Sequence, residues 1–119
     1  MIRKANIGDI KEIYKLIEVF ANKGEMLHRP LTDMYDNLRE FYVYEENSAI
    51  LGSCALHIIW EDMAEIRSLT VKEDASGKGI GSAIVNICLD EARAIGIKKV
   101  FALTYKPAFF EKLGFMSID

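Results

Sequence analysis

The stretch Ser76-Gly77-Lys78-Gly79-Ile80-Gly81 lies between a predicted strand, residues 63–71, and the clearest predicted helix of the chain, residues 79–95. Its alternating glycines lack a Cβ, so their backbone N–H groups can approach a ligand closely and can adopt positive φ. The helix that follows adds free N–H groups and the positive end of its dipole. Lys78 adds a positive charge nearby. The stretch therefore predicts a phosphate-binding turn.

The spacing of the glycines excludes two common kinds of phosphate-binding site. The nucleotide P-loop is excluded, because no Gly-Lys-Ser/Thr follows four intervening residues. Ser82 and Ile84 occupy the positions where a Gly-x-Gly-x-x-Gly motif would need its third glycine, and the turn follows several strands instead of opening a first βαβ unit. A turn that only connects two elements is the alternative, and the conformational cost of three glycines disfavours it.

Hydrophobic periodicity predicts a mixed α/β (α+β) fold around this turn. Residues 41–71 read as three antiparallel strands, 41–44, 50–60 and 63–71, joined by turns at 45–48 and 61–62. A helix connects strand 63–71 to a buried strand at 98–103, so these two strands should be parallel. The remaining predictions are a strand at 2–5, a helix capped by Asn6 and ended by Gly24, a helix capped by Thr32, a short helix from Pro107 and a last strand from Gly114-Phe115.

The overall composition is that of one compact domain, residues 1–119. Half of the residues are hydrophobic and the net charge is -3, which disfavours a nucleic-acid partner. No apolar run is long enough for a membrane span, and the start lacks a signal-peptide core. Cys54 and Cys88 lie in apolar runs and read as core residues of a reduced, cytoplasmic protein. No cluster of His, Cys and carboxylates predicts a metal site.

In the predicted strand 63–71, the alternation of polar and apolar side chains is interrupted. Under strict alternation Glu65 and Arg67 would share a face with Leu69 and Val71, so the pattern predicts a β-bulge between the two pairs. Glu65 is a candidate general base, because a carboxylate near an ammonium group can take its proton. An exposed strand charge is the equally weighted alternative at this point.

The glycine turn and the closing residues Phe110-Glu111-Lys112-Leu113-Gly114-Phe115 resemble the GNAT superfamily of acyl-CoA N-acyltransferases. The signature of that family is Gln/Arg-x-x-Gly-x-Gly/Ala, and here Ser76 replaces the Gln or Arg. The resemblance covers nearly the whole chain. It implies a mostly antiparallel sheet with a central splayed pair of parallel strands, about four helices and a C-terminal hairpin. That hairpin is incomplete in this sequence, so either the chain is truncated or a partner chain, as in a homodimer, supplies the missing edge.

The resemblance implies acetyl-CoA as the co-substrate. The splayed strands of GNATs expose a backbone N–H that can hold the thioester carbonyl oxygen. The residues that it places around the donor are Leu69, Thr70, Val71, Ser76, Gly77, Lys78, Gly79, Ile80, Gly81 and Ser82.

Several segments are also similar to the amino-acid acetyltransferases that make N-acetylglutamate in arginine biosynthesis. They are residues 26–31, 54–56, 64–71 and 101–105. This likeness implies direct acetyl transfer to the amine of a small substrate such as glutamate, within a ternary complex, and favours Glu65 as the base. Phe110 stands at the position of the usual general-acid tyrosine, which makes Tyr105 the candidate replacement.

The acceptor of an amino-acid acetyltransferase carries carboxylates, which bind best to arginine or lysine. Arg29 precedes the second predicted helix, where GNATs bind acceptors, and Arg67 and Lys106 are further candidates. For each of them the alternative is a solvated surface cation. Two other functions stay open: a GNAT that acts on a polyamine, a drug or a protein N-terminus, and a non-catalytic acyl-CoA binding module.

Overall fold

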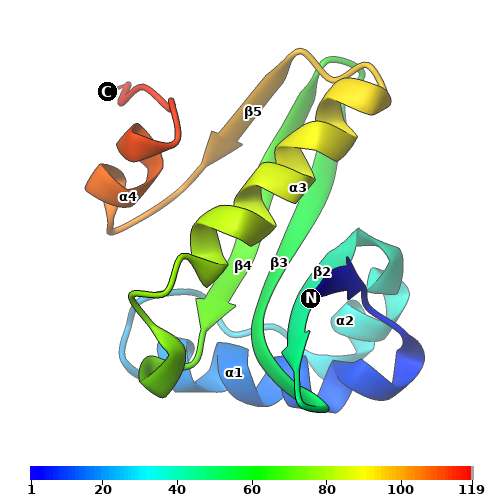
Figure 1. Cartoon of the computed structure of the whole chain (residues 1–119). Helices are drawn as coiled ribbons and strands as arrows, with labels where there is room; N and C mark the ends of the chain where they lie inside the picture. The colour runs from blue at the N-terminus through cyan, green and yellow to red at the C-terminus, as the bar shows by residue number, and fades with distance from the viewer. Residues whose placement is uncertain (119) are drawn as a thin grey trace.

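The structure is a computed structural model that describes residues 1–118 (Figure 1). Its strands are β1 (Ile2–Lys4), β2 (Phe41–Glu46), β3 (Ala49–Trp60), β4 (Met63–Val71) and β5 (Lys99–Ala102). Its α-helices are α1 (Ile10–Asn22), α2 (Leu31–Asp36), α3 (Ile80–Ala94) and α4 (Pro107–Lys112). Three short 3₁₀ helices are η1 (Ile7–Asp9), η2 (Leu38–Glu40) and η3 (Glu73–Ala75).

The five strands form one sheet in the order β1-β2-β3-β4-β5. The first three pairings are antiparallel, and β4 and β5 are parallel, which confirms the predicted mixed sheet. The parallel pair lies at one edge of the described sheet and not at its centre, with β5 outermost. The two strands pair only from Met63–Lys99 to Ile66–Ala102, whereas β4 continues to Val71. The second half of β4 therefore has no strand beside it on this edge of the described sheet (Figure 1).

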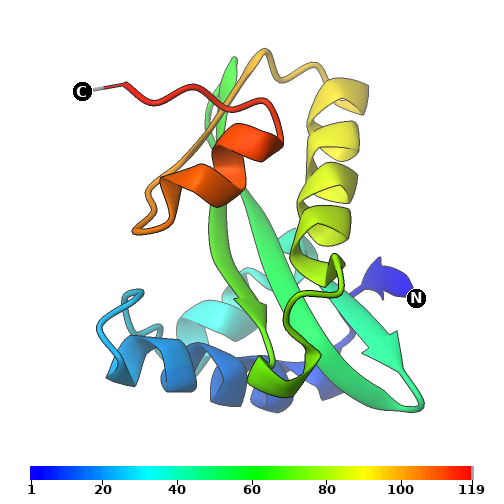
Figure 2. The same cartoon turned by 60° about the vertical axis from the view of Figure 1, so that its left-hand side comes forward.

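Helices cover the two faces of the sheet (Figure 2). One core cluster joins α3 to β3 and β4 through residues such as Cys54, Ile66 and Ile84. The other joins α1 and α2 to β2 and β3 through residues such as Ile13 and Ala55. Neighbouring Cys54 and Ala55 fall in different clusters because successive side chains of a strand point to opposite faces.

The two cysteines are core residues, as predicted. Cys54 on β3 and Cys88 on α3 are both fully buried and free. Contact with the Cys88 thiol, and then burial, raise the pKa of the Cys54 thiol well above its usual value. The Cys54 thiol thus stays protonated, and both buried side chains act as small hydrophobic groups.

Three predictions about individual helices and strands were wrong. The helix after residue 30 begins without a Thr32 cap, because the carbonyl of Pro30 already accepts its first hydrogen bond, from the Met34 N–H at 3.2 Å. The strand near 98–103 is only half-buried, since β5 is an edge strand and Leu103 is exposed. Residues 115–118 form no strand, because the Phe115 N–H donates back to the Phe110 carbonyl at 3.1 Å and caps α4.

The hairpin between β2 and β3 is tighter than predicted. Its turn consists of Asn47 and Ser48 alone, which both have positive φ, 51° and 66°. Two-residue turns of this kind match the right-handed twist of the flanking strands. β2 therefore extends to Glu46.

Asp9 ties the first strand to the first helix. Its carboxylate accepts two hydrogen bonds from the Arg3 guanidinium, at 2.7 and 3.1 Å, and one from the Asn6 N–H at 2.8 Å. Its side chain is 11% exposed. The bonds from Arg3, and then the bond from Asn6, hold the pKa of Asp9 below its usual value. The charged form of Asp9 therefore stabilises the fold.

We expect Asp9→Asn to lower the free energy of unfolding by about 2 kcal/mol at neutral pH, because it removes charge-assisted hydrogen bonds. Since the pKa of Asp9 is lower in the folded state, this contribution is complete above the unfolded pKa of about 3.9 and is lost as the pH falls through the folded value. Urea unfolding of both proteins over a pH series measures it. The matched control is Asp90→Asn, since Asp90 pairs with Arg93 at 3.1 Å but is 70% exposed. The control should change stability by less than about 0.5 kcal/mol, and a loss at Asp9 that did not shrink in acid would contradict the assignment.

Candidate active site

A cavity of about 1730 Å³ opens where β5 leaves β4. Four segments line it: the loop after α1, β4 from Glu65 onward, η3 with the glycine turn, and the chain from Ala102 to Lys112. These segments are far apart in the sequence, and the divergence of the two parallel strands brings them together. The cavity thus joins the predicted phosphate-binding turn to the predicted catalytic and acceptor residues.

The glycine turn has the geometry of an anion cradle. Gly77 and Gly79 have φ of 76° and 81°, and a Cβ at either position would meet no protein atom within 4 Å. Gly79 is the N-cap of α3, and its carbonyl accepts the first helical hydrogen bond, from Ala83. In the described chain, residues 1–118, the N–H groups of Ile80, Gly81 and Ser82 donate to no protein acceptor. These open amides at the positive end of a helix fit the pyrophosphate of a CoA thioester.

Gly81 has a packing role that the sequence did not indicate. A Cβ there would lie 3.3 Å from the Phe109 ring and 3.5 Å from a methyl group of Val71. The absence of a side chain therefore lets α4 approach the start of α3.

Eight of the ten residues predicted to hold the donor line the cavity; Thr70 and Lys78 do not. The Thr70 side chain is buried and bonded to the Ser53 hydroxyl at 2.7 Å, so only its backbone is left for a ligand. Lys78 is exposed outside the cavity. Ser76 lines the cavity, but its hydroxyl donates to the Glu73 carbonyl at 2.8 Å and so shapes the turn.

The bulge predicted in β4 is present. Thr70 pairs with Ser53 and Arg67 pairs with Ala55, so Ser68 and Leu69 together stand opposite Cys54. Ser68 has a φ of 54°, the left-handed conformation that lets the strand absorb the extra residue. As a result Leu69 packs against the α3 core cluster, as Val71 does.

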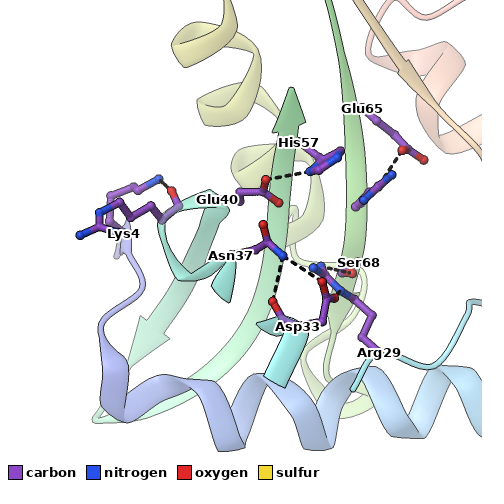
Figure 3. A network of polar contacts seen from close by, with 10 residues as sticks. Lys4, Arg29, Asp33, Asn37, Glu40, His57, Glu65 and Ser68 are labelled. Atoms are coloured by element: carbon purple, nitrogen blue, oxygen red, sulfur yellow. Dashed lines mark hydrogen bonds and ion pairs between the residues drawn. The ribbon is translucent and has the colours of Figure 1, made fainter. Parts of the chain in front are cut away.

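Glu65 is not an exposed strand charge. It is 8% exposed, it lines the cavity, and its Oε1 accepts a hydrogen bond from Arg67 Nε at 2.6 Å (Figure 3). Arg67 lines the cavity as well. A carboxylate that lines the cavity and is held in place by Arg67 can accept a proton from an amine bound there, which is what a base for acetyl transfer requires.

Arg29 is held rigidly at the cavity. Its Nε donates to Asp33 Oδ2 at 2.8 Å, its Nη1 donates to Ser68 Oγ at 3.1 Å, and its guanidinium carbon lies 5.1 Å from the centre of the Phe41 ring. The side chain is only 11% exposed. Asn37 in turn donates to Asp33 Oδ1 at 2.9 Å (Figure 3). Arg29 is therefore a fixed cation and not a solvated one.

The remaining candidates lie in the segment between β5 and α4. Tyr105 and Lys106 line the cavity, and Tyr105 is 78% exposed. Lys106 lies 3.9 Å from Glu25 and is also largely exposed. Phe110 also lines the cavity, but it is largely buried and packs edge-on against Phe109 and Phe115.

Ser68, Asp33 and Asn37 were not among the predicted site residues. Asp33 follows Arg29 by four residues and Asn37 follows Asp33 by four, and this helical spacing is a local signal that could have indicated them. Nothing in the local sequence marks a serine for positive φ, and the contact between Arg29 and Ser68 depends on how the segment before α2 meets β4. Two other findings concern residues 1–118: no group of three or more His, Cys, Asp or Glu side chains could hold a metal ion, and no helix has the length and apolarity of a membrane span.

Comparison with known proteins identifies the family. The model of the acetyltransferase (GNAT) family matches residues 9–115. The chain belongs to the GNAT family. It is thus an N-acetyltransferase that takes its acetyl group from acetyl-CoA.

Among the curated relatives of this GNAT domain, the amino-acid acetyltransferase of Mycobacterium tuberculosis is 35% identical over 122 residues. That match covers 100% of this chain and 70% of the relative. The amino-acid acetyltransferase of Neisseria meningitidis serogroup A is also 35% identical, and the match covers 98% of this chain but only 27% of that longer protein.

Two solved structures share this GNAT fold closely. A Mycobacterium tuberculosis protein in complex with CoA and the ligand NLQ superimposes with a TM-score of 0.96 at 35% identity, covering 100% of this chain and 73% of that one. N-acetylglutamate synthase from Neisseria gonorrhoeae, in complex with coenzyme A and N-acetyl-glutamate, gives a TM-score of 0.96 at 33% identity, covering 100% of this chain and 28% of that one.

Proposed function

We propose that this GNAT domain acetylates the amine of a small substrate, an amino acid with glutamate as the first candidate, by direct transfer in a ternary complex. The observation that carries the proposal is the fixed guanidinium of Arg29 in the same cavity as Glu65 and the glycine turn. A rigid guanidinium binds a carboxylate through paired hydrogen bonds. The names of the two amino-acid acetyltransferases that resemble the chain over its length support the same acceptor class.

The donor side of the proposed site consists of the glycine turn and the bulged half of β4. The open amides of Ile80, Gly81 and Ser82 would hold the pyrophosphate. Leu69 and Val71 line the cavity next to them and offer apolar contacts. Acetyl-CoA supplies a thioester whose carbonyl carbon is the electrophile.

The acceptor side requires a neutral amine and a proton for the departing thiolate. Glu65 is the proposed base, acting directly or through one water. Tyr105 is the proposed proton donor, because it lines the cavity and Phe110 has no hydroxyl group. Arg67 and Lys106 add positive charge for a second carboxylate.

Direct transfer is favoured by the position of the cysteines. Cys54 and Cys88 are fully buried in the core between β3 and α3, and neither lines the cavity. Neither thiol could carry the acetyl group between donor and acceptor.

The test is a thiol-release assay with acetyl-CoA against a panel of amines. The panel contains the amino acids, polyamines and peptides with a free N-terminus. We expect turnover with an amino acid, glutamate first, and identification of the N-acetyl product by mass spectrometry. Turnover confined to polyamines or peptides would contradict the proposed acceptor, and CoA binding without turnover on any amine would indicate a non-catalytic module.

Gly79→Ala should raise the Kd for CoA at least about tenfold. The new Cβ would occupy the open space of the cradle, and φ at this position is positive. Isothermal titration with CoA measures the change. Gly96→Ala is the matched control, since Gly96 also has positive φ and open space around its Cβ but lies at the other end of α3. Both variants should lose about 1 kcal/mol of stability, and an equal loss of CoA binding in both would contradict the assigned cradle.

A further inference from the structure

Ser68 lies in an unfavourable backbone conformation at the centre of the site. Its φ of 54° is uncommon for a residue with a Cβ, and of all residues glycine accepts it most readily. Non-glycine residues in this region persist where their surroundings hold them, often at functional sites. A serine at this position of the bulge therefore indicates that its side chain makes a contact that glycine could not make.

The surroundings hold Ser68 from two sides. Its hydroxyl accepts a hydrogen bond from Arg29 Nη1 at 3.1 Å, and its carbonyl accepts one from the Ser53 hydroxyl at 3.4 Å. Ser53 is fully buried and also bonded to Thr70 at 2.7 Å. The backbone of the bulge and the side chain of Arg29 are thus joined through one residue. The hydroxyl group is the feature that glycine lacks.

The contacts of Arg29 leave part of its guanidinium for a ligand. Of its five N–H donors, the Nε–H is bonded to Asp33 and one Nη1–H to Ser68. Within residues 1–118, Nη2 donates to no protein acceptor. Asn37, Asp33, Arg29 and Ser68 form one chain of contacts from the end of α2 to the bulge of β4 (Figure 3). The chain sets the direction in which the free edge of the guanidinium points.

We propose that Ser68 is a positioning residue that fixes the carboxylate-binding edge of Arg29 relative to the bulge of β4. The inference rests on the proposed function, in which Arg29 binds the acceptor carboxylate and the bulged strand lies beside the acetyl group. Ser68 acts only through Arg29. It sets the distance between the place where the carboxylate binds and the place where the amine must attack.

Two substitutions of Ser68, with one control elsewhere, separate the effect of its hydroxyl from the effect of its backbone conformation. Ser68→Ala keeps the Cβ and removes the hydrogen bond, and it should raise the KM for the amino acid about tenfold with an unchanged Kd for CoA. Ser68→Gly also relieves the positive φ, so it should show the same rise in KM together with a higher Tm than Ser68→Ala. Ser48→Ala is the matched control, because Ser48 has a φ of 66° in the remote β2–β3 turn. The control should leave the KM for the amino acid and the KM for acetyl-CoA at the wild-type level.

A double-mutant cycle tests whether Ser68 acts through Arg29. The variant with both Arg29→Ala and Ser68→Ala should be no worse than Arg29→Ala alone, since the partner of the hydroxyl is already absent. An unchanged acceptor KM in Ser68→Ala, or independent and multiplicative losses in the double variant, would overturn the inference while the proposed function stands. A wild-type protein that acetylates no amine bearing a carboxylate would overturn the proposed function, and this inference with it.

Discussion

Glu65→Gln should lower kcat for the amino-acid acceptor by a factor of about 100 to 10,000, which is the usual contribution of general acid–base catalysis. The substitution preserves size, and its amide oxygen can still accept the hydrogen bond that Arg67 Nε donates to Glu65 at 2.6 Å. It removes the charge and the proton-accepting oxygen. The fold, the cavity and the glycine turn should therefore be unaffected, and the Kd for CoA should equal that of the wild type.

Steady-state kinetics by thiol release, with CoA titration on the same samples, measures this effect. The matched control is Glu61→Gln, in the exposed turn between β3 and β4, and it should leave kcat unchanged. The assigned role would be wrong if Glu65→Gln kept wild-type kcat. Loss of CoA binding together with kcat would instead indicate that Glu65 supports the structure of the donor site.

Arg29→Ala should lower kcat/KM for the amino acid about 100-fold, mainly through a higher KM for the acceptor. The size follows from loss of a paired, charge-assisted contact with a carboxylate at a largely buried position. Arg29→Lys should recover little, because an ammonium group cannot donate to Asp33 and Ser68 and still present a planar edge to the substrate.

The carboxylate itself provides the sharpest test of Arg29. Acceptors in which the carboxylate is replaced by a neutral amide should react slowly with the wild type and should lose no further activity in Arg29→Ala. The control is Arg93→Ala, because Arg93 is exposed near the end of α3. It should change neither the KM for the acceptor nor the KM for acetyl-CoA. An unchanged acceptor KM in Arg29→Ala would contradict the assignment of an amino acid as substrate.

The contacts of Asp33 explain why Arg29 can still bind a second carboxylate although Asp33 is negatively charged. Asp33 accepts the Nε–H bond on one side, and Asn37 holds the other carboxylate oxygen. Asp33 thus orients the guanidinium, while Nη2 keeps its donors. Its side chain is nearly half-exposed, so solvent screens its negative charge more than it screens the buried cation.

Local features of this protein were predictable from its sequence. Gly77 and Gly79 have positive φ, Asn6 caps the first helical turn as predicted, and the charges of Glu65 and Arg67 on an otherwise apolar strand face indicated the bulge. Each of these depends on residues close together in the chain, because backbone geometry and side-chain periodicity act over a few residues. The conformation of the glycine turn could be predicted for the same reason, since the turn and the start of α3 are contiguous.

Only the tertiary structure decided which groups meet across the cavity. Leu69 lines the cavity, whereas the side chain of the next residue, Thr70, bonds to buried Ser53. The bulge decides which of these two neighbours faces the cavity. Arg29 and Ser68 are 39 residues apart, and their contact exists because α2 packs against the sheet beside the bulge. The sequence alone determined the glycine turn and the elements that carry it. The contact that joins Arg29 to the bulge came from packing between distant segments, which no local pattern records.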